Sequence, residues 1–473
     1  MAPTLTAPPT QTGARTMLRL ATAGSVDDGK STLVGRLLYD TNSVLTDTLD
    51  HVEQVSRRKG LASADLALLT DGLRAEREQG ITIDVAYRYF ATPARTFILA
   101  DCPGHAQYTR NTVTGSSTAD VIVLLVDARN GVVEQTRRHL AVVSLLRVPH
   151  VVLAVNKIDL VDYSEDRFTA IATEFAQLAR RFNLPDIHCV PVSATDGDNV
   201  AIRSTRTPWY DGPTVLGYLE TVDVTPLATF AELRFPVQLV IRPQTAALAP
   251  WASGAPDLTA DYRGYAGQIA SGRVQVGDEI VNLPRGSHAR VEAIDTADGP
   301  LEVAVAGQSV ILRLSSDIDV SRGDMIAAAD APPAPVREVT ATVCWLAERE
   351  LTAGTRVLAQ HGTALTKALV RSIDAKLDLG GDGKHPVWVD ADRLRLNDLA
   401  RITIAFANPL PIDTYNRHRR TGAFILVDSA DGWTLGAGMA GPPAFTVEHH
   451  RPPEEFGEIA FDSTTPDDPG TAP

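Results

Sequence analysis

The chain has 473 residues, enough for about three domains of roughly 150 residues each. Its 44% hydrophobic and 22% charged residues are typical of a folded globular protein, and no apolar run approaches the roughly eighteen residues of a membrane span. The formal net charge of −14 argues against extensive nucleic-acid binding, which needs lysines and arginines to neutralise phosphates. The cysteines at 102, 189 and 344 lie far apart, which favours reduced thiols in the cytoplasm over a disulfide framework or a metal site.

Both ends of the chain are expected to be disordered. Residues 1–14 are rich in Thr, Pro and Ala and lack the basic start and apolar core of a secretory signal. Residues 443–473 form a Pro-rich acidic tail, in which residues 448–473 hold seven acids and one arginine, a net charge of −6. We therefore expect the folded part to lie between these two segments.

Between residues 15 and 225, apolar runs alternate with helical patterns. We expect strands at 17–23, 84–90, 96–100, 121–126, 151–155 and 188–192, and helices at 30–39, 135–147, 165–182 and 213–222. This alternation predicts a mostly parallel sheet with helices on both faces. Ligands of such sheets bind beyond the carboxyl ends of the strands, and the polar motifs of this chain follow those ends.

The first polar motif has the pattern G-x-x-x-x-G-K-S and joins the first strand to the first helix. It consists of Gly24, Ser25, Val26, Asp27, Asp28, Gly29, Lys30 and Ser31, and Thr32 continues the helix. The glycines let backbone N–H groups point at phosphates, Lys30 would reach the β- and γ-phosphates, and the Ser31 hydroxyl would bind Mg²⁺. The alternative is a chance match in a glycine-rich turn, but the flanking strand and helix favour a phosphate-binding loop.

The second motif follows the strand at 96–100 and consists of Asp101, Cys102, Pro103 and Gly104. The Asp101 carboxylate can hold Mg²⁺, and the Gly104 amide can face a γ-phosphate. His105 comes next, and its pKa near neutrality suits it to position the attacking water, either as a base or only as an orienting group. The alternative for His105 is a solvated loop histidine.

Two further motifs predict the base. Asn156, Lys157 and Asp159 follow the strand at 151–155, and the Asp159 carboxylate can accept from the ring N–H and the exocyclic amine of guanine, donors that adenine does not offer in this arrangement. Ser193 and Ala194 follow the sixth strand, where a backbone N–H can reach the guanine oxygen. Four motifs in order, each at a strand end, predict that the chain binds GTP.

The segment 76–83 lies between the first helix and the second strand. A loop here can close over the nucleotide, with Thr82 offering its hydroxyl to Mg²⁺ and its amide to the γ-phosphate. The alternative for Thr82 is an ordinary strand threonine. The candidate catalytic residues are therefore His105, Lys30 and Thr82, and the candidate Mg²⁺ ligands are Ser31, Thr82 and Asp101.

These motifs resemble those of the translation-factor class of GTPases, and longer segments are similar to one family within it. Residues 24–32, 71–90, 107–111, 127–131, 135–139 and 209–214 resemble the large, GTP-hydrolysing subunit of bacterial sulfate adenylyltransferase. Translation elongation factors typically carry His where Asp28 stands and Thr where Ser31 stands.

Beyond the GTPase motifs, short strands separated by glycine turns predict β-barrels at 231–332 and 336–442. The resemblance implies that these are the second and third domains of a translation-class GTPase. The expected fold class is therefore an α/β P-loop GTPase domain at 15–225 followed by two β-barrel domains. The Ala- and Pro-rich stretch at 243–260 is expected to be an exposed loop.

The resemblance also implies a function. In this family GTP hydrolysis drives the formation of adenylyl sulfate and pyrophosphate from ATP and sulfate, while a separate small subunit carries the ATP and sulfate chemistry. The expected partner is that ATP-binding subunit, with no nucleic acid and no membrane, and the expected cofactors are GTP and Mg²⁺. A translation factor that binds tRNA or the ribosome, and a free-standing regulatory GTPase, remain alternatives; the acidic charge and the Asp28 and Ser31 pattern count against the first.

Overall fold

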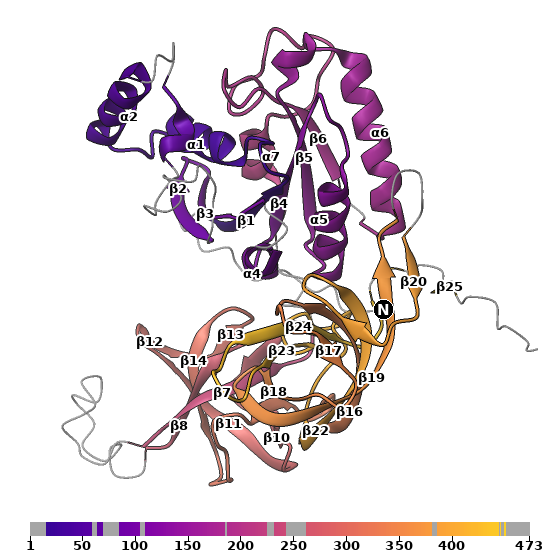
Figure 1. The fold of residues 1–473 in the computed structure, drawn as a ribbon. Helices are drawn as coiled ribbons and strands as arrows, with labels where there is room; N and C mark the ends of the chain where they lie inside the picture. The colour runs from indigo at the N-terminus through magenta and orange to yellow at the C-terminus, as the bar shows by residue number, and fades with distance from the viewer. Residues whose placement is uncertain are drawn as a thin grey trace, which may run out of the picture.

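The structure is a computed structural model that describes residues 16–58, 64–69, 85–104, 109–184, 187–224, 231–242, 262–380, 386–443, 445 and 449–450. Within these residues an α/β domain is followed by two β-barrels, so the predicted fold class is confirmed (Figure 1). Among the helices of this part of the chain, none is both long and apolar enough to cross a membrane. The predicted exposed loop at 243–260 lies outside the described residues.

The α/β domain is built on a six-stranded sheet with the order β2-β3-β1-β4-β5-β6. All neighbouring strands are parallel except β2, which runs antiparallel to β3 at one edge. The strands are β1 (Thr16–Gly24), β2 (Ala86–Ala91), β3 (Arg95–Asp101), β4 (Val121–Asp127), β5 (His150–Asn156) and β6 (Ile187–Pro191). Each strand end lies within two residues of its predicted position, and for the parallel strands this is because buried parallel strands appear in sequence as continuous apolar runs.

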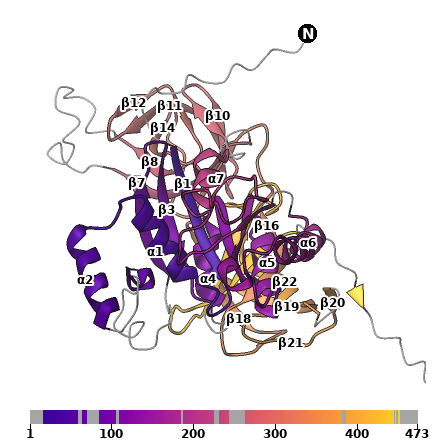
Figure 2. The same ribbon diagram turned by 90° about the horizontal axis from the view of Figure 1, so that it is seen from above.

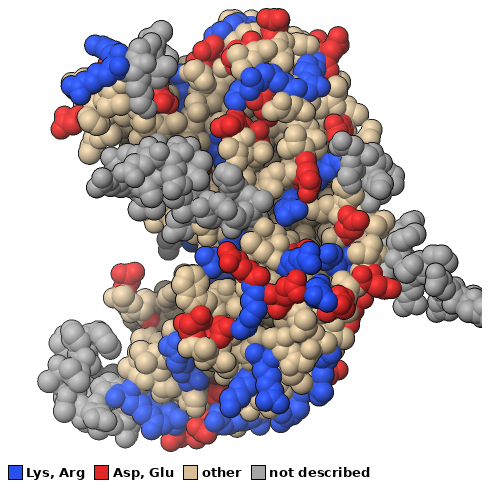
Figure 3. Space-filling view, in the orientation of Figure 1, with Lys and Arg blue, Asp and Glu red and all other residues tan. Residues whose placement is uncertain are grey.

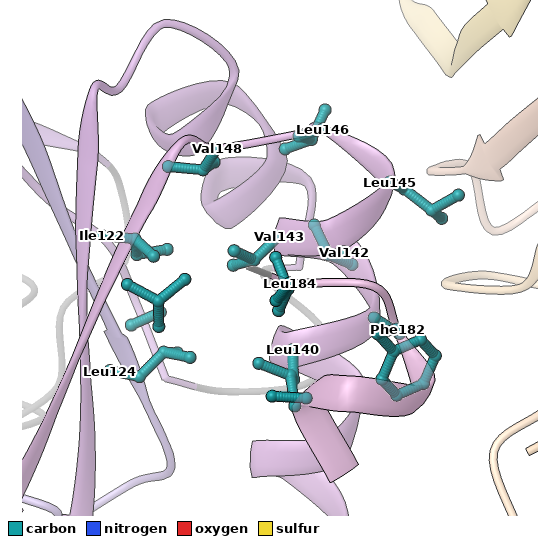
Figure 4. Packing of buried hydrophobic residues seen from close by; sticks show 14 of the residues in the cluster. Ile122, Leu124, Leu140, Val142, Val143, Leu145, Leu146, Val148, Phe182 and Leu184 are labelled. Carbon is teal, nitrogen blue, oxygen red and sulfur yellow. The ribbon is translucent and has the colours of Figure 1, made fainter. Parts of the chain in front are cut away.

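Helices cover both faces of this sheet. The four predicted helices are present as α1 (Lys30–Asp40), α5 (Glu134–Leu145), α6 (Glu165–Arg181) and α7 (Val215–Thr221). Successive residues of β4 alternate between two apolar clusters, one with α1 and α7 and the other with α5 and α6. Figure 4 shows Leu140 and Val143 of α5 facing Ile122 and Leu124 of β4 across one of these layers.

Within the described residues, two α-helices were not predicted. Helix α2 (Thr46–Arg58) projects beyond α1, away from the sheet (Figures 1 and 2). Helix α4 (Thr109–Ser117) follows the Asp101–Gly104 motif and lacks an apolar stripe. It packs closely on the sheet through Gly115, where a Cβ would collide with the Cys102 Sγ and lie 3.4 Å from the Ala100 Cβ. Its position therefore depends on tertiary contact, which a periodicity argument does not detect.

Each barrel contains six strands in a closed ring. The first ring is formed by β7 (Arg234–Ile241), β8 (Gly264–Gln268), β14 (Ser309–Leu314), β11 (Ser287–Thr296), β10 (Glu279–Leu283) and β15 (Met325–Ala328), and the pairing of β10 with β11 closes it. The second is formed by β16 (Val336–Trp345), β22 (Leu399–Leu410), β19 (Ala364–Asp378), β18 (Arg356–His361), β23 (Ala423–Val427) and β24 (Thr434–Ala440), closed by β18 with β19. Each ring encloses its own apolar cluster.

One apolar cluster continues from the α/β domain into the second barrel. Leu146 and Phe182 of the α/β domain belong to it together with Trp388 and Phe445 from the C-terminal part of the chain. The rings of Phe182 and Phe445 meet edge to face with centroids 5.2 Å apart. The α/β domain is thus packed on the second barrel through a shared core.

This packing corrects the predicted start of the disordered tail at residue 443. Phe445 is buried, and β25 (His449–His450) pairs in parallel with β20 (Val387–Val389). The aromatic contacts of Phe445 with Phe182 and Trp388 stabilise this part of the chain. Residues 451–473 lie outside the described part of the chain.

Candidate nucleotide-binding site

The predicted phosphate loop joins β1 to α1. Gly29 precedes the helix with a left-handed φ of 90°, and a Cβ there would collide with the Asn156 side-chain amide. Lys30 is buried, and its Nζ donates to the carbonyl oxygens of Gly24 at 3.0 Å and Ser25 at 2.7 Å. Burial lowers the pKa of this ammonium, although nearby Asp28 opposes the shift. The loop thus wraps around the buried Lys30 ammonium, and a phosphate group bound in the loop would meet this positive charge.

Asp28 stabilises the loop from inside. Its Oδ2 accepts a hydrogen bond from the Ser25 backbone N–H at 2.5 Å, and its side chain is buried. Burial raises the pKa of Asp28, while the Ser25 N–H and the Lys30 charge act in the opposite direction. Asp28 therefore determines the shape of the loop, and no direct contact with a nucleotide is needed to explain it.

The Asp101–Gly104 motif lies directly against this loop. Asp101 ends β3, and its Oδ1 accepts from the Thr22 hydroxyl of β1 at 2.9 Å. A Cβ on Gly104 would lie 2.8 Å from the Gly24 carbonyl oxygen and 2.9 Å from that of Ser25. Only glycine fits this approach without displacing the loop, so the structure brings the second predicted motif against the first.

The two base-side motifs are joined by Asn156. Its Nδ2 donates to the Asp28 carbonyl oxygen at 2.7 Å, and its Oδ1 accepts from the Ala194 backbone N–H at 3.0 Å. The amide that we predict to face the guanine oxygen is thus bonded to Asn156 in this structure. Asp159 lies half-exposed in the 3₁₀ turn η3 (Ile158–Val161), beside these loops.

The sequence analysis did not assign a role to Asp127, which ends β4 directly opposite Asn156. Lys157 lies 3.0 Å from the Asp127 Oδ2, and Arg129 lies 2.6 Å from the same oxygen. Burial opposes ionisation of Asp127, but the hydrogen bonds from Arg129 and Lys157 outweigh it and lower the pKa. Asp127 stands at the end of a strand, as Asp101 does, and this position in the sequence could have identified Asp127 as a candidate site residue.

A second polar network holds the base-side loops together. The Tyr163 hydroxyl donates to Asp198 at 3.1 Å, and Arg206 pairs with Asp196 at 2.9 Å and Asp198 at 3.1 Å. The Trp209 indole N–H donates to the Tyr163 carbonyl oxygen at 3.1 Å. These residues tie the segment after Asp159 to the segment after Ala194, and no local pattern distinguishes them from ordinary surface residues.

Thr82 and His105 lie outside the described residues, so their roles stay predictions. Thr32 lies half-buried on α1, beside Ser31 in the first helical turn. Ser193 is buried and its Oγ accepts from the Asp196 backbone N–H at 3.3 Å. The remaining predicted residues converge on the same edge of the sheet.

The α/β domain carries three motifs at its strand ends: a phosphate loop, an Asp-x-x-Gly motif and a guanine-type Asn-Lys-x-Asp motif. Two β-barrels follow this domain. Together these features define a GTPase of the translation-factor class. Residues 15–249 match the family model described as the elongation factor Tu GTP-binding domain, and residues 338–440 match that of the GTP-eEF1A C-terminal domain-like family. Among solved structures, Sup35 complexed with GDP aligns with a TM-score of 0.39 and 23% identity, covering 93% of this chain and 95% of that one.

Relatives identify the family within this class. The chain is 46% identical to sulfate adenylyltransferase subunit 1 of Bacteroides thetaiotaomicron over 430 residues, which cover 89% of this chain and 86% of that protein. It is 49% identical to the bifunctional enzyme CysN/CysC of Mycobacterium tuberculosis over 425 residues, which cover 90% of this chain and 67% of that protein. The chain belongs to the family of sulfate adenylyltransferase subunit 1.

Proposed function

We propose that this protein is the GTP-hydrolysing subunit of a sulfate adenylyltransferase. It couples GTP hydrolysis to the formation of adenylyl sulfate and pyrophosphate from ATP and sulfate, with the ATP and sulfate chemistry on a separate small subunit. The 46% identity to sulfate adenylyltransferase subunit 1 over most of the chain carries this proposal. The phosphate and base motifs, which the structure brings together at one edge of the sheet, support a GTP site in this chain.

The phosphates of GTP would bind inside the 24–31 loop. Lys30 would exchange its bonds to the Gly24 and Ser25 carbonyl oxygens for bonds to phosphate oxygens. Ser31 and Asp101, with Thr82, would hold Mg²⁺, and these hard oxygen donors fit that ion, which neutralises phosphate charge. His105 would orient the attacking water.

The structure supports a route from the nucleotide to the barrels. Gly104 contacts the phosphate loop, and the chain enters α4 a few residues later. Helix α4 contacts the second barrel near both ends, where the Arg110 guanidinium lies 5.6 Å from the Trp433 ring centroid and Arg419 donates to the Ser117 carbonyl oxygen at 3.2 Å. A displacement of Gly104 on γ-phosphate loss would therefore move α4 against the second barrel.

The alternative is a translation factor that binds tRNA or the ribosome. Figure 3 shows acidic and basic side chains interspersed on the visible face, rather than the continuous basic surface that nucleic-acid binding favours. The formal charge of −14 points the same way. Tight binding of charged tRNA at physiological salt would favour this alternative over our proposal.

The deciding experiment measures sulfate-dependent pyrophosphate release from ATP by this chain together with its copurified small subunit. We expect GTP to stimulate the release, and Lys30→Ala to abolish that stimulation. GTP hydrolysis without any effect on ATP and sulfate would contradict the proposed function. GTP stimulation that survives Lys30→Ala would contradict the proposed role of the phosphate loop in coupling.

A further inference from the structure

Residues 415–420 form a loop of the second barrel that we call the junction loop. The Tyr415 hydroxyl donates to the Leu146 carbonyl oxygen of the α/β domain at 2.9 Å. Arg419 donates to the Ser117 carbonyl oxygen at the end of α4 at 3.2 Å. The junction loop is therefore fastened to the α/β domain at two separate points.

The same loop also contacts the first barrel. His418 Nε2 lies 3.2 Å from a carboxylate oxygen of Glu232, which also pairs with Arg417. The Arg420 guanidinium donates to the Gln268 side-chain oxygen at 2.8 Å. The junction loop thus lies where all three domains meet, and its charges act on the contacts among them.

Four arginines gather at this junction: Arg19 and Arg147 from the α/β domain, and Arg419 and Arg420 from the junction loop. Arg147 donates to backbone carbonyls of the junction loop, and Arg419 and Arg420 also donate to neutral oxygens. In the described part of the chain, none of the four forms an ion pair with a carboxylate. This contrasts with the bidentate pairing of Arg234 and Asp413 between the two barrels, at 2.9 and 3.1 Å.

The arginine charges act on one another. Burial lowers the pKa of Arg420, and the charges of Arg19 and Arg419 lower it further. Burial and Arg419 lower the pKa of Arg147 in the same way. The nearby carboxylate of Asp120 accepts the Arg19 backbone N–H at 2.9 Å, and burial raises its pKa. Among the described residues, Asp120 is the carboxylate beside these arginines, and one carboxylate does not balance four guanidinium groups, so this part of the structure carries excess positive charge at the junction.

A cavity of about 270 Å³ opens beside Arg19, one of the four arginines. Arg19 lines it together with Thr118 and with Tyr87 and Tyr89 of the edge strand β2, whose side chains are 47% and 68% exposed. The rest of its lining is aliphatic, so Arg19, Thr118 and the two tyrosines supply its polar side chains. The cavity therefore offers room and hydrogen-bond donors beside Arg19.

We propose that this junction is a binding site for a multivalent oxyanion of the phosphate or sulfate type, held by Arg19, Arg147, Arg419 and Arg420. Guanidinium forks match the geometry of such oxyanions and bind them through charge-assisted hydrogen bonds. The bound anion removes the repulsion among the arginines and bridges the α/β domain to the second barrel. It thereby stabilises the packed arrangement of the three domains.

The test is calorimetric titration of the purified chain with pyrophosphate, the anion that the proposed reaction releases. The choice of this probe rests on the proposed function, whereas the site itself does not. The protein is saturated with GDP, so that the phosphate loop does not compete for the probe. Because the titration needs no small subunit, its result is independent of whether the chain supports adenylyl sulfate formation.

We expect one pyrophosphate per chain, with Arg419→Gln and Arg420→Gln each weakening binding about tenfold, since each removes a charge-assisted hydrogen bond. Arg420→Lys should bind more tightly than Arg420→Gln, because it keeps the charge. The control is Arg356→Gln, which removes an exposed arginine of β18 in the same barrel. Equal weakening in this control, or no binding to the parent protein, would overturn the proposal.

A second titration with sulfate at matched ionic strength separates the two anion classes. Tighter binding of pyrophosphate than of sulfate identifies a polyphosphate site, and the reverse identifies a sulfate site; both support an oxyanion junction. Either anion should raise the melting temperature of the parent chain more than chloride does, and this rise should shrink in Arg420→Gln. A rise of the same size in that variant would refute the bridging role of the anion.

Discussion

Replacing Asn156 with alanine removes a buried side chain that joins the phosphate loop to both guanine-side motifs. Asn156 is only 2% exposed, and its amide makes a 2.7 Å bond to the Asp28 carbonyl oxygen and a 3.0 Å bond from the Ala194 N–H. Alanine leaves the Asp28 carbonyl oxygen and the Ala194 N–H without these hydrogen bonds. The Lys157 ammonium, which donates to the Asp27 carbonyl oxygen, would then remain as a side-chain contact between the two loops.

The expected loss follows from these two hydrogen bonds. A buried polar group that loses its partner costs about 1–3 kcal/mol, and about 1–2 kcal/mol for each of the two lost bonds gives a total of about 2–4 kcal/mol. Because nucleotide binding requires both loops in place, we expect most of this loss in GDP affinity. The dissociation constant should rise roughly 30- to 1000-fold.

The assay is fluorescence titration with a GDP analogue, paired with thermal unfolding. The matched control is Asn282→Ala in the first barrel, where a fully buried asparagine donates to the Asp319 carbonyl oxygen at 2.9 Å and to Asp324 at 3.1 Å. The control should lower the melting temperature and leave GDP affinity unchanged. GDP affinity within threefold of the parent in Asn156→Ala, or equal weakening in the control, would refute this reasoning.

Three further predictions concern single residues. Asp159→Asn replaces a carboxylate acceptor with an amide, so GTP affinity should fall and xanthosine triphosphate affinity should rise; a competition titration that shows both nucleotides weakened contradicts the assignment. Gly104→Ala places a methyl group 2.8 Å from the Gly24 carbonyl oxygen, and overpacking of about 1–3 kcal/mol should weaken a non-hydrolysable GTP analogue roughly 5- to 150-fold. Burial lowers the pKa of His139 to about 3 in the folded chain, whereas the unfolded value is about 6.5. As pH falls below 6.5 the unfolded chain takes up a proton on His139 and the folded chain does not, so the free energy of unfolding falls between pH 6.5 and pH 3. Unfolding at pH 7 and pH 5 should therefore depend less on pH in His139→Gln, and an unchanged slope argues against this reasoning.

The sequence predicted the position of a motif well where the motif occupies a few consecutive residues at a strand end. The 24–31 loop lies between β1 and α1 as expected, and Gly104 lies against it. Helix α4 was not predicted because its residues lack an apolar period, and contact with Cys102 and Ala100 positions it. Asp127 was not assigned a role because its partner Lys157 comes from the next strand.

The sequence by itself determined the class of site and the order of the domains, because strands, glycine turns and phosphate loops are specified by short local patterns. The tertiary structure alone decided which surfaces the three domains share. Arg19, Arg147, Arg419 and Arg420 come from distant parts of the chain, and no local pattern relates them. They meet because the shared core around Phe182 and Phe445 packs the α/β domain on the second barrel, and such packing depends on complementary surfaces that form only after each domain has folded.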